Sequence, residues 1–240
     1  MKRVLITGAS GGLGQALCQA FSKEPIRLGL HVFKQKREGA HLVQNLQSEH
    51  CEPHLFQADL RNPADTQTLF RQFFETWGGI DILINNAGIS RNRLFQKESP
   101  EAWDEVIRID LSGAFYCTRE AARIMEKQGK GHIINIASGA ADKGRAGQAA
   151  YAAAKRGLIG LSQTAAKELG QNGIQVNAVC PGYLPTPMTA GLSPAQSKKL
   201  ITENVLGRPS SLEEVSGFIN MLSKMEHVSG QVFHLDSRIV

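Results

Sequence analysis

The chain has 240 residues, of which 42% are apolar and 20% charged, and its formal net charge is +5. This length fits one α/β domain, no apolar run reaches the roughly 20 residues that cross a bilayer, and the start Met1-Lys2-Arg3-Val4 does not resemble a cleavable signal. The excess of positive charge favours an anionic ligand such as a phosphorylated cofactor or an acidic carrier. No basic block is interleaved with aromatic residues, so we expect neither a nucleic-acid partner nor a membrane partner.

The four cysteines have neither CxxC nor metal-ligand spacing. We expect free, buried thiols, a cytoplasmic protein and no metal site.

Short apolar runs alternate with helical patterns along the chain. The expected strands are Arg3–Thr7, Arg27–Phe33, His54–Gln57, Ile82–Asn85, His132–Ala137, Gln175–Val179 and Gln231–Leu235. The expected helices are Leu13–Ser22, Pro63–Trp77, Pro100–Lys127, Gln148–Leu169 and Ser211–Leu222. This alternation predicts a single-domain Rossmann fold, in which a doubly wound, seven-stranded parallel sheet carries helices on both faces. Right-handed crossovers bring the carboxyl ends of the strands to one edge, where ligands bind.

A glycine-rich segment, TGASGGLG (residues 7–14), follows the first strand and opens a helix. Gly8, Gly12 and Gly14 allow a tight turn and the close approach of a pyrophosphate to the helix N-terminus. A glycine-rich turn without a ligand is the alternative, but the position between strand and helix favours a nucleotide site.

The end of the second strand indicates which dinucleotide binds. A carboxylate there would bind the ribose hydroxyls of NAD, but this chain has Lys34, Lys36 and Arg37 instead. These cations suit a 2′-phosphate, so we expect NADP(H); a solvated basic loop is the alternative.

Two further segments lie at the predicted cofactor edge. Asp59 follows the third strand and is expected to accept a hydrogen bond from the adenine amino group. The small residues of Asn85-Asn86-Ala87-Gly88 allow close approach to the adenosine ribose, and Asn85 also suits a structural turn amide.

Tyr151 and Lys155 share one helix face at the spacing i, i+4, and Ser138 ends the fifth strand thirteen residues before Tyr151 (151 − 138). A neighbouring ammonium lowers the pKa of a tyrosine, which can then act as a general acid. Isolated Tyr-x-x-x-Lys pairs are common, but the serine and the upstream nucleotide motif favour a catalytic role.

Taken in order, TGASGGLG, NNAG, Ser138, YxxxK and Pro181-Gly182 resemble the short-chain dehydrogenase/reductase family over essentially the whole chain. Residues 147–160, Gly88-Ile89 with Arg91-Asn92-Arg93, and Gly230-Gln231 are most similar to the 3-oxoacyl-[acyl-carrier-protein] reductases. The resemblance implies that Ser138 orients the carbonyl, that Tyr151 donates the proton, and that Lys155 lowers the tyrosine pKa and holds the nicotinamide ribose.

The resemblance also implies a division of the single domain. The cofactor half covers about 1–130, the catalytic and substrate half about 131–240, and a lid about 183–209, which fits an acyl chain. Small residues on the helix from Gln148 permit close packing, either on its own sheet or on another helix; the resemblance implies that this helix and the Pro100–Lys127 helix form a four-helix dimer interface within a homotetramer, with a homodimer as the alternative. The implied cofactor-binding residues are Gly8, Ser10, Gly11, Gly12, Leu13, Gly14, Lys34, Asp59, Leu60, Asn86, Ala87, Gly88, Tyr151, Lys155, Pro181, Gly182, Leu184 and Thr186.

The chain departs from the family pattern at several positions. In the family, an asparagine usually completes the catalytic set by holding a water of the proton relay, and Asp110 stands at that position here. Asp110 either positions this water in the same way or draws Lys155 away from Tyr151. Gly11 lacks the basic side chain often found there, Gln171-Asn172 replaces an arginine of the carrier reductases, and Asp236-Ser237-Arg238 replaces Asp-Gly-Gly.

Three functions remain open at this stage. The first is NADPH-dependent reduction of a 3-oxoacyl thioester on acyl carrier protein, in fatty-acid or specialised polyketide or polyene synthesis. The second is oxidoreduction of a free small alcohol, sugar or ketone. The third, which Asp110 and the Asp236-Ser237-Arg238 segment suggest, is a weakly active partner subunit.

Overall fold

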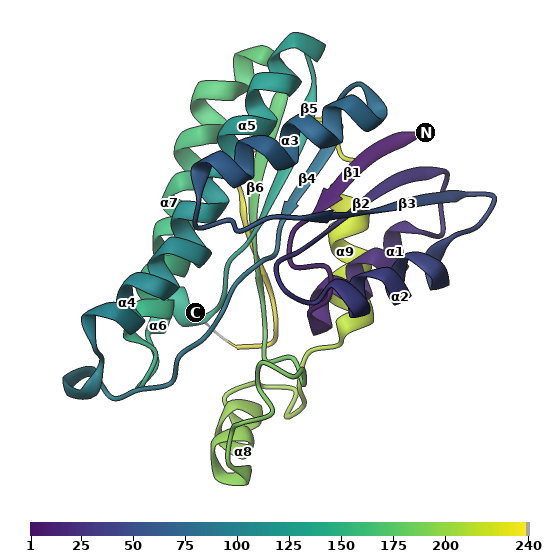
Figure 1. Cartoon of the computed structure of the whole chain (residues 1–240). Helices are drawn as coiled ribbons and strands as arrows, with labels where there is room; N and C mark the ends of the chain where they lie inside the picture. Colours follow the sequence, from purple (N-terminus) through teal and green to yellow (C-terminus); the bar gives the residue numbers. More distant parts are fainter. Residues whose placement is uncertain (239–240) are drawn as a thin grey trace.

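A computed structural model describes residues 1–238, and its centre is one sheet of seven parallel strands (Figure 1). The strands are β1 (Lys2–Ile6), β2 (Ile26–Val32), β3 (Cys51–Gln57), β4 (Ile82–Asn85), β5 (Gly131–Ile136), β6 (Ile174–Pro181) and β7 (Val232–Leu235). Their order in the sheet is β3-β2-β1-β4-β5-β6-β7. The strand order changes direction between β1 and β4, which is the position where such sheets bind ligands. The predicted fold class is confirmed.

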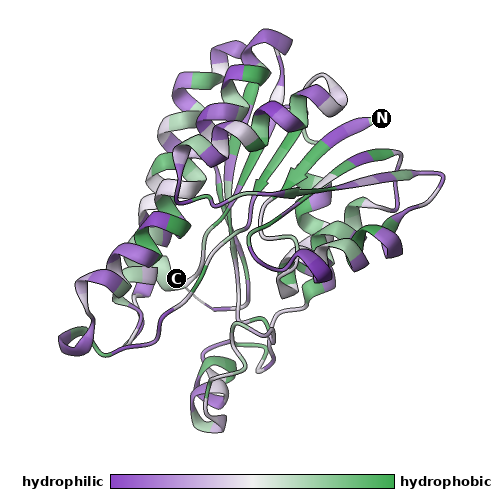
Figure 2. Cartoon of the chain, in the orientation of Figure 1, coloured by the Kyte–Doolittle hydropathy of each residue, from purple (hydrophilic) through white to green (hydrophobic). Residues whose placement is uncertain are grey.

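Helices cover both faces of the sheet. One face carries α1 (Gly12–Phe21), α2 (Lys36–Leu46) and α9 (Leu212–Leu222), and the other carries α3 (Pro63–Trp77), α5 (Ala114–Gln128) and α7 (Ala149–Leu169) (Figure 1). Each layer buries an apolar cluster: Leu17, Phe21 and Ile219 belong to the first, and Phe73 and Met125 to the second. Figure 2 shows the same division, with hydrophobic strands between helices whose outer faces are largely hydrophilic. A sheet buried on both faces requires the continuous apolar runs seen in the sequence.

The expected Pro100–Lys127 helix is not continuous. It consists of α4 (Pro100–Ile107), a π-helical segment over Arg108–Gly113, and α5. A π-helical turn accommodates an extra residue and changes the direction in which side chains point. Here it turns Asp110 and Gly113 into the protein interior.

Several short elements were not among the expected ones. The helix α2 is amphipathic but strongly polar, with only Gly39, Leu42 and Leu46 buried, and its apolar pattern is therefore weak. The remaining elements are α6 (Ala140–Lys143), α8 (Pro194–Thr202) and 3-10 turns at Phe95–Lys97 and Gly170–Asn172.

The 183–209 segment, which contains α8, has its two ends fastened together. The Ser210 amide donates to the Tyr183 carbonyl over 2.9 Å. Near its end, the amides of Val205 and Leu206 donate to the carbonyl and the hydroxyl of Ser237, both over 3.2 Å. Hydrogen bonds therefore hold the two ends of this segment together and connect it to the residues that follow β7.

The structure also bears on two expectations from composition. All four cysteines are free and buried, as predicted. Within residues 1–238, no helix combines the length and the apolar character needed to cross a membrane.

Candidate active site

A cavity of about 670 Å³ opens at the carboxyl edge of the strands. It brings together most of the site residues expected from the sequence, but not Asn85 or the three cations Lys34, Lys36 and Arg37. The expected residues that line the cavity are Gly8, Ser10, Gly11, Gly12, Leu13, Gly14, Asp59, Leu60, Asn86, Ala87, Gly88, Asp110, Ser138, Tyr151, Lys155, Pro181, Gly182, Leu184 and Thr186. Segments distant in the sequence thus form one site, and right-handed parallel topology accounts for their meeting at one edge.

The turn after β1 leaves no room for a side chain at Gly8, Gly12 or Gly14. Gly8 has φ +64°, and a Cβ on it would lie 2.8 Å from the Cα of Ala87. A Cβ on Gly14 would collide with the Gly8 carbonyl, and one on Gly12 would lie 2.8 Å from Cγ2 of Thr186. The turn leads into α1, whose first turn has no side-chain cap. This backbone cradle fits the pyrophosphate of a dinucleotide, because the free N–H groups and the helix dipole both favour an anion.

His31, on β2, accepts a hydrogen bond from this turn. Its Nδ1 lies 3.3 Å from the Gly8 amide and its Nε2 lies 3.1 Å from the Ala58 carbonyl. These contacts require the neutral ring, with Nε2 donating and Nδ1 accepting. Burial lowers the pKa of His31 to about 4, so the ring is neutral at physiological pH. The sequence analysis did not single out His31, because its role arises only from contacts with distant residues.

Asn86 and Thr7 fix the adjoining loop. The Asn86 side chain donates to the carbonyls of Thr7 (2.9 Å) and Gly8 (3.1 Å), and the Thr7 hydroxyl accepts from the Asn86 and Ala87 amides. Asn85 instead points into the core, where its amide donates to Asn135 over 2.7 Å. Asn85 is therefore the structural amide of the two alternatives, whereas Asn86 shapes the cavity wall.

Adenosine is expected at the end of the cavity next to β2 and β3. The cation that lines this end is Arg61 and not the expected Lys34. Lys34 is exposed and lies 5.2 Å from the Phe33 ring centre, outside the cavity lining. Arg61 does line the cavity, packs 5.0 Å from the same ring, and is paired with Asp59 over 2.6 Å. The Arg61 hydrogen bonds hold the pKa of Asp59 below its usual value. A cation two residues after an acid at a strand end was the available sequence signal for Arg61.

The catalytic side chains meet at the opposite end. Lys155 is buried, donates to the Ile136 carbonyl over 3.0 Å and lies 5.6 Å from the centre of the Tyr151 ring. Burial raises the pKa of Tyr151, while the Lys155 charge and a hydrogen bond with Ser138 act in the lowering direction. The lysine therefore acts in the predicted sense, but in this structure burial outweighs it and keeps the phenol protonated.

Asp110 lies beside this lysine and is fully buried. Its Oδ2 is 3.3 Å from Lys155 Nζ, and its Oδ1 accepts from the Ile89 amide over 2.8 Å. A Cβ on Gly88 would lie 2.7 Å from the same carboxylate, so only glycine fits there. Burial raises the pKa of Asp110. Burial alone would lower the pKa of Lys155, but the attraction of Asp110 and Tyr151 raises it. The two upward shifts have different causes: burial raises the pKa of Asp110 against the lowering effect of Lys155, whereas the charge of Asp110 raises the pKa of Lys155 against the lowering effect of burial.

The family follows from comparison with known proteins. The family model described as short chain dehydrogenase matches residues 2–197. The chain belongs to the short-chain dehydrogenase family. It is 31% identical over 237 residues to the 3-oxoacyl-[acyl-carrier-protein] reductase FabG of Staphylococcus aureus (strain Mu50), with 98% of this chain and 96% of that protein covered. It is 36% identical over 239 residues, with the same coverage, to the 3-oxoacyl-[acyl-carrier-protein] reductase of Synechocystis sp..

A solved structure agrees with this assignment. The crystal structure of a variant actinorhodin polyketide ketoreductase with NADPH superposes with a TM-score of 0.91 at 26% identity, covering 98% of this chain and 96% of that one. The predicted family is therefore confirmed, and the protein is an oxidoreductase.

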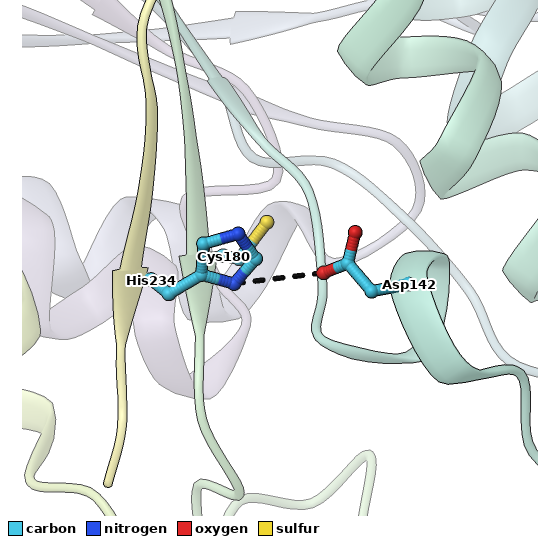
Figure 3. Close-up of side chains that lie close together, drawn as sticks. All are labelled: Asp142, Cys180 and His234. Carbon is cyan, nitrogen blue, oxygen red and sulfur yellow. Dashed lines mark ion pairs between the residues drawn. The ribbon is translucent and has the colours of Figure 1, made fainter. Parts of the chain in front are cut away.

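Among the described residues, one group of possible metal ligands lies where α6, β6 and β7 approach one another. Asp142 on α6, Cys180 on β6 and His234 on β7 approach one another, and Asp142 Oδ2 is 3.5 Å from His234 Nδ1 (Figure 3). The other carboxylate oxygen is paired with Arg156 over 2.8 Å, and burial raises the pKa of the Cys180 thiol to about 12. Because Arg156 compensates the charge of the Asp142 carboxylate and the Cys180 thiol is protonated, this group suits a structural contact between α6 and β7 better than a metal site. The expectation of no metal site stays a prediction.

Proposed function

We propose that this short-chain dehydrogenase reduces a 3-oxoacyl thioester carried by acyl carrier protein to the 3-hydroxyacyl thioester, using NADPH. The observation that carries the proposal is one cavity that joins a pyrophosphate cradle to Ser138, Tyr151 and Lys155. The names of the relatives, two 3-oxoacyl-[acyl-carrier-protein] reductases and a polyketide ketoreductase with NADPH, favour this substrate and cofactor over a free alcohol or sugar. We place the reaction in fatty-acid or polyketide-type synthesis.

The chain's own residues supply the proton chemistry. The Ser138 hydroxyl donates a hydrogen bond to the substrate carbonyl oxygen and orients it toward Tyr151. Tyr151, which burial keeps protonated, transfers its phenolic proton to that oxygen as negative charge develops there. The ammonium of Lys155 then stabilises the phenolate that remains. NADPH, when bound, supplies the hydride that reduces the carbonyl carbon.

NADPH rather than NADH is proposed from the charge at the adenosine end. Arg61 lines the cavity there, Lys34 lies next to the same Phe33 ring, and no carboxylate ends β2. Arg61 is the cation of this pair that borders the cavity, so we assign it the main contact with a 2′-phosphate and leave Lys34 as a weaker one.

We also propose that the enzyme acts as a homotetramer in the cytoplasm. Exposed aromatic side chains on α4 and α5, Trp103 and Phe115, suit a helical interface with a second copy. Light scattering coupled to size-exclusion chromatography tests the assembly: a mass of four chains is expected, two chains would support the dimer, and one chain would contradict both.

The function is tested by following NADPH oxidation with acetoacetyl-acyl-carrier-protein, with NADH and with a free ketone in parallel. Rapid oxidation is expected only with NADPH and the thioester. Tyr151→Phe is expected to reduce the rate by about 10²–10⁴-fold, the usual contribution of a general acid, while NADPH still binds. Turnover of the free ketone alone would overturn the thioester assignment. NADPH binding without turnover of any substrate would favour the weakly active partner subunit.

A further inference from the structure

The substrate half of the cavity carries positive charge that the chemistry at Tyr151 does not use. Arg145, in the loop after α6, and Lys199, on α8, both line this half. Arg145 is half-buried, and Lys199 is exposed. The two residues come from different elements, and each borders the same opening.

Neither cation has a partner of its own. In the part of the chain that the structure describes, the Arg145 guanidinium and the Lys199 ammonium take part in no hydrogen bond or ion pair. Arginines that are half-buried are usually paired, because removing an unpaired charge from water is costly. Arg238, which also lines the cavity, shows the contrast, since Asp236 neutralises it. The one exposed acid on this side, Glu203, leaves the opening with an excess of positive charge.

We infer that Arg145 and Lys199 form an anion-binding mouth that holds the phosphate of the arm to which the acyl thioester is attached. This inference rests on the proposed function. A guanidinium can bind a phosphate with two parallel hydrogen bonds, and a lysine adds a mobile point charge on the other side. The apolar residues Leu192 and Leu200 line the cavity beside these cations and suit the uncharged part of the arm.

The position of the two cations supports a role in substrate capture rather than in proton transfer. Arg145 lies on the loop that leads from Ser138 to Tyr151 and lines the same cavity as both, and in the proposed substrate the length of the pantetheine chain separates the phosphate from the reacting carbonyl. Lys199 lies on α8, within the 183–209 segment, and lines the same cavity. An arm that passes between them has its charge fixed at the surface and its thioester directed inward.

The test compares acetoacetyl thioesters that differ only in phosphate: acetoacetyl-acyl-carrier-protein, acetoacetyl-coenzyme A and the phosphate-free acetoacetyl-pantetheine. Arg145→Ala is expected to raise KM about tenfold for both phosphate-bearing thioesters, since a charge-assisted hydrogen bond to the phosphate is lost. Lys199→Ala is expected to raise it about threefold, because exposed ion pairs are weaker. With acetoacetyl-pantetheine, both variants should match the unaltered enzyme in kcat and KM.

Matched controls are Lys198→Ala, next to Lys199 on the same exposed helix, and Arg71→Ala, an exposed arginine on α3 outside the cavity lining. Neither should change KM for any thioester, and circular dichroism confirms that all four variants fold. Equal losses with acetoacetyl-pantetheine would overturn the inference, because the residues would then act on shape. A loss confined to coenzyme A would also overturn it, because only its nucleotide phosphates would be involved.

A binding measurement separates this inference from the proposed function. Calorimetry with phosphopantetheine and with pantetheine, on the NADPH-loaded enzyme, is expected to show tighter binding of the phosphate form and loss of that difference in Arg145→Ala. This result would support the mouth even if no thioester were reduced. Equal affinity for both probes would overturn the mouth even if reduction were rapid.

Discussion

Asp110 and Lys155 form a buried ion pair at the centre of the active site, with 3.3 Å between Oδ2 and Nζ. The carboxylate adds negative charge beside the lysine that assists Tyr151. It acts to raise the pKa of both neighbours, and so opposes the lowering effect of Lys155 on the phenol. The Lys155 amine nevertheless remains close to the Tyr151 ring, so the pair moderates the catalytic lysine without removing it from the site.

Asp110→Asn is expected to lower the pKa of Tyr151 and of Lys155, because the carboxylate charge that raises both is removed. Reduction needs the protonated phenol, so the alkaline fall of kcat/KM should move to lower pH. The asparagine oxygen can still accept from the Ile89 amide, which preserves the local fold. A pH profile from pH 6 to 10 measures the shift; an unchanged or higher alkaline limb would contradict this role. Asp110→Ala should destabilise the protein by about 3–5 kcal/mol by leaving a buried charge unpaired.

Gly8→Ala is expected to abolish NADPH binding and to destabilise the fold by more than about 1 kcal/mol. The substituted residue would keep a positive φ and would press against the Ala87 backbone. Gly217→Ala is the matched control, because a Cβ on this exposed glycine of α9 would meet no atom within 4 Å. It should stabilise the helix by about 1 kcal/mol and leave cofactor binding unchanged. Thermal unfolding and fluorescence titration with NADPH test both, and intact binding in Gly8→Ala would refute the cradle.

We expect the protein to lose stability in mild acid, because His31 and His132 are buried as neutral rings. Burial lowers the pKa of both His31 and His132 to about 4, below the unfolded value of about 6.5. Between these values the unfolded chain binds more protons, so the free energy of unfolding falls as pH decreases from 6.5 toward 4. Each histidine contributes a loss of up to about 3 kcal/mol.

Urea unfolding at several pH values measures this dependence. His132→Gln should reduce the slope of stability against pH, whereas the exposed control His41→Gln should leave it unchanged. A stability that stays constant from pH 6.5 to 4.5 would be incompatible with neutral, buried rings.

Arg61→Ala is expected to raise KM for NADPH about tenfold while KM for NADH stays the same, since one charge-assisted contact with the 2′-phosphate is lost. Its removal also leaves the Asp59 carboxylate without its partner, and this negative charge then repels the phosphate. Lys34→Ala should raise KM for NADPH by less than about threefold, because this lysine is exposed. Steady-state kinetics with both cofactors provide the comparison. A larger effect of Lys34→Ala would reverse the assignment.

The strands and the cofactor turn were predictable because their signals are local. Each strand is a short apolar run, and the glycines of residues 7–14 stand between a strand and a helix, so the expected boundaries differ from β1 and β4 by at most one residue. Even β3, which begins three residues before its expected start, includes Pro53 only because it is an edge strand.

The features that could not be predicted from the sequence arise from contacts between segments that are distant along the chain. The π-helical segment around Asp110 is invisible to a helical pattern that continues through it. His31 and Arg61 acquire their positions from Gly8 and Phe33, far along the chain. Lys34 shows the reverse case: its charge and position suggested a phosphate contact, but the direction of its side chain is decided by packing beside Phe33.

Thr186 packs so closely on Gly12 that a Cβ on the glycine would lie 2.8 Å from the threonine Cγ2. Thr186 is the fourth residue of the 183–209 segment and lies against Gly12 of the pyrophosphate cradle, while Val205, near the end of the segment, donates to the Ser237 carbonyl. Between these two contacts, residues of α8 line the cavity. We expect the same segment to cover a dinucleotide in the cradle and to border the entry of the proposed acyl arm. We therefore expect cofactor to bind before substrate and to leave after product; product-inhibition kinetics measure this order, and a random-order pattern would contradict it.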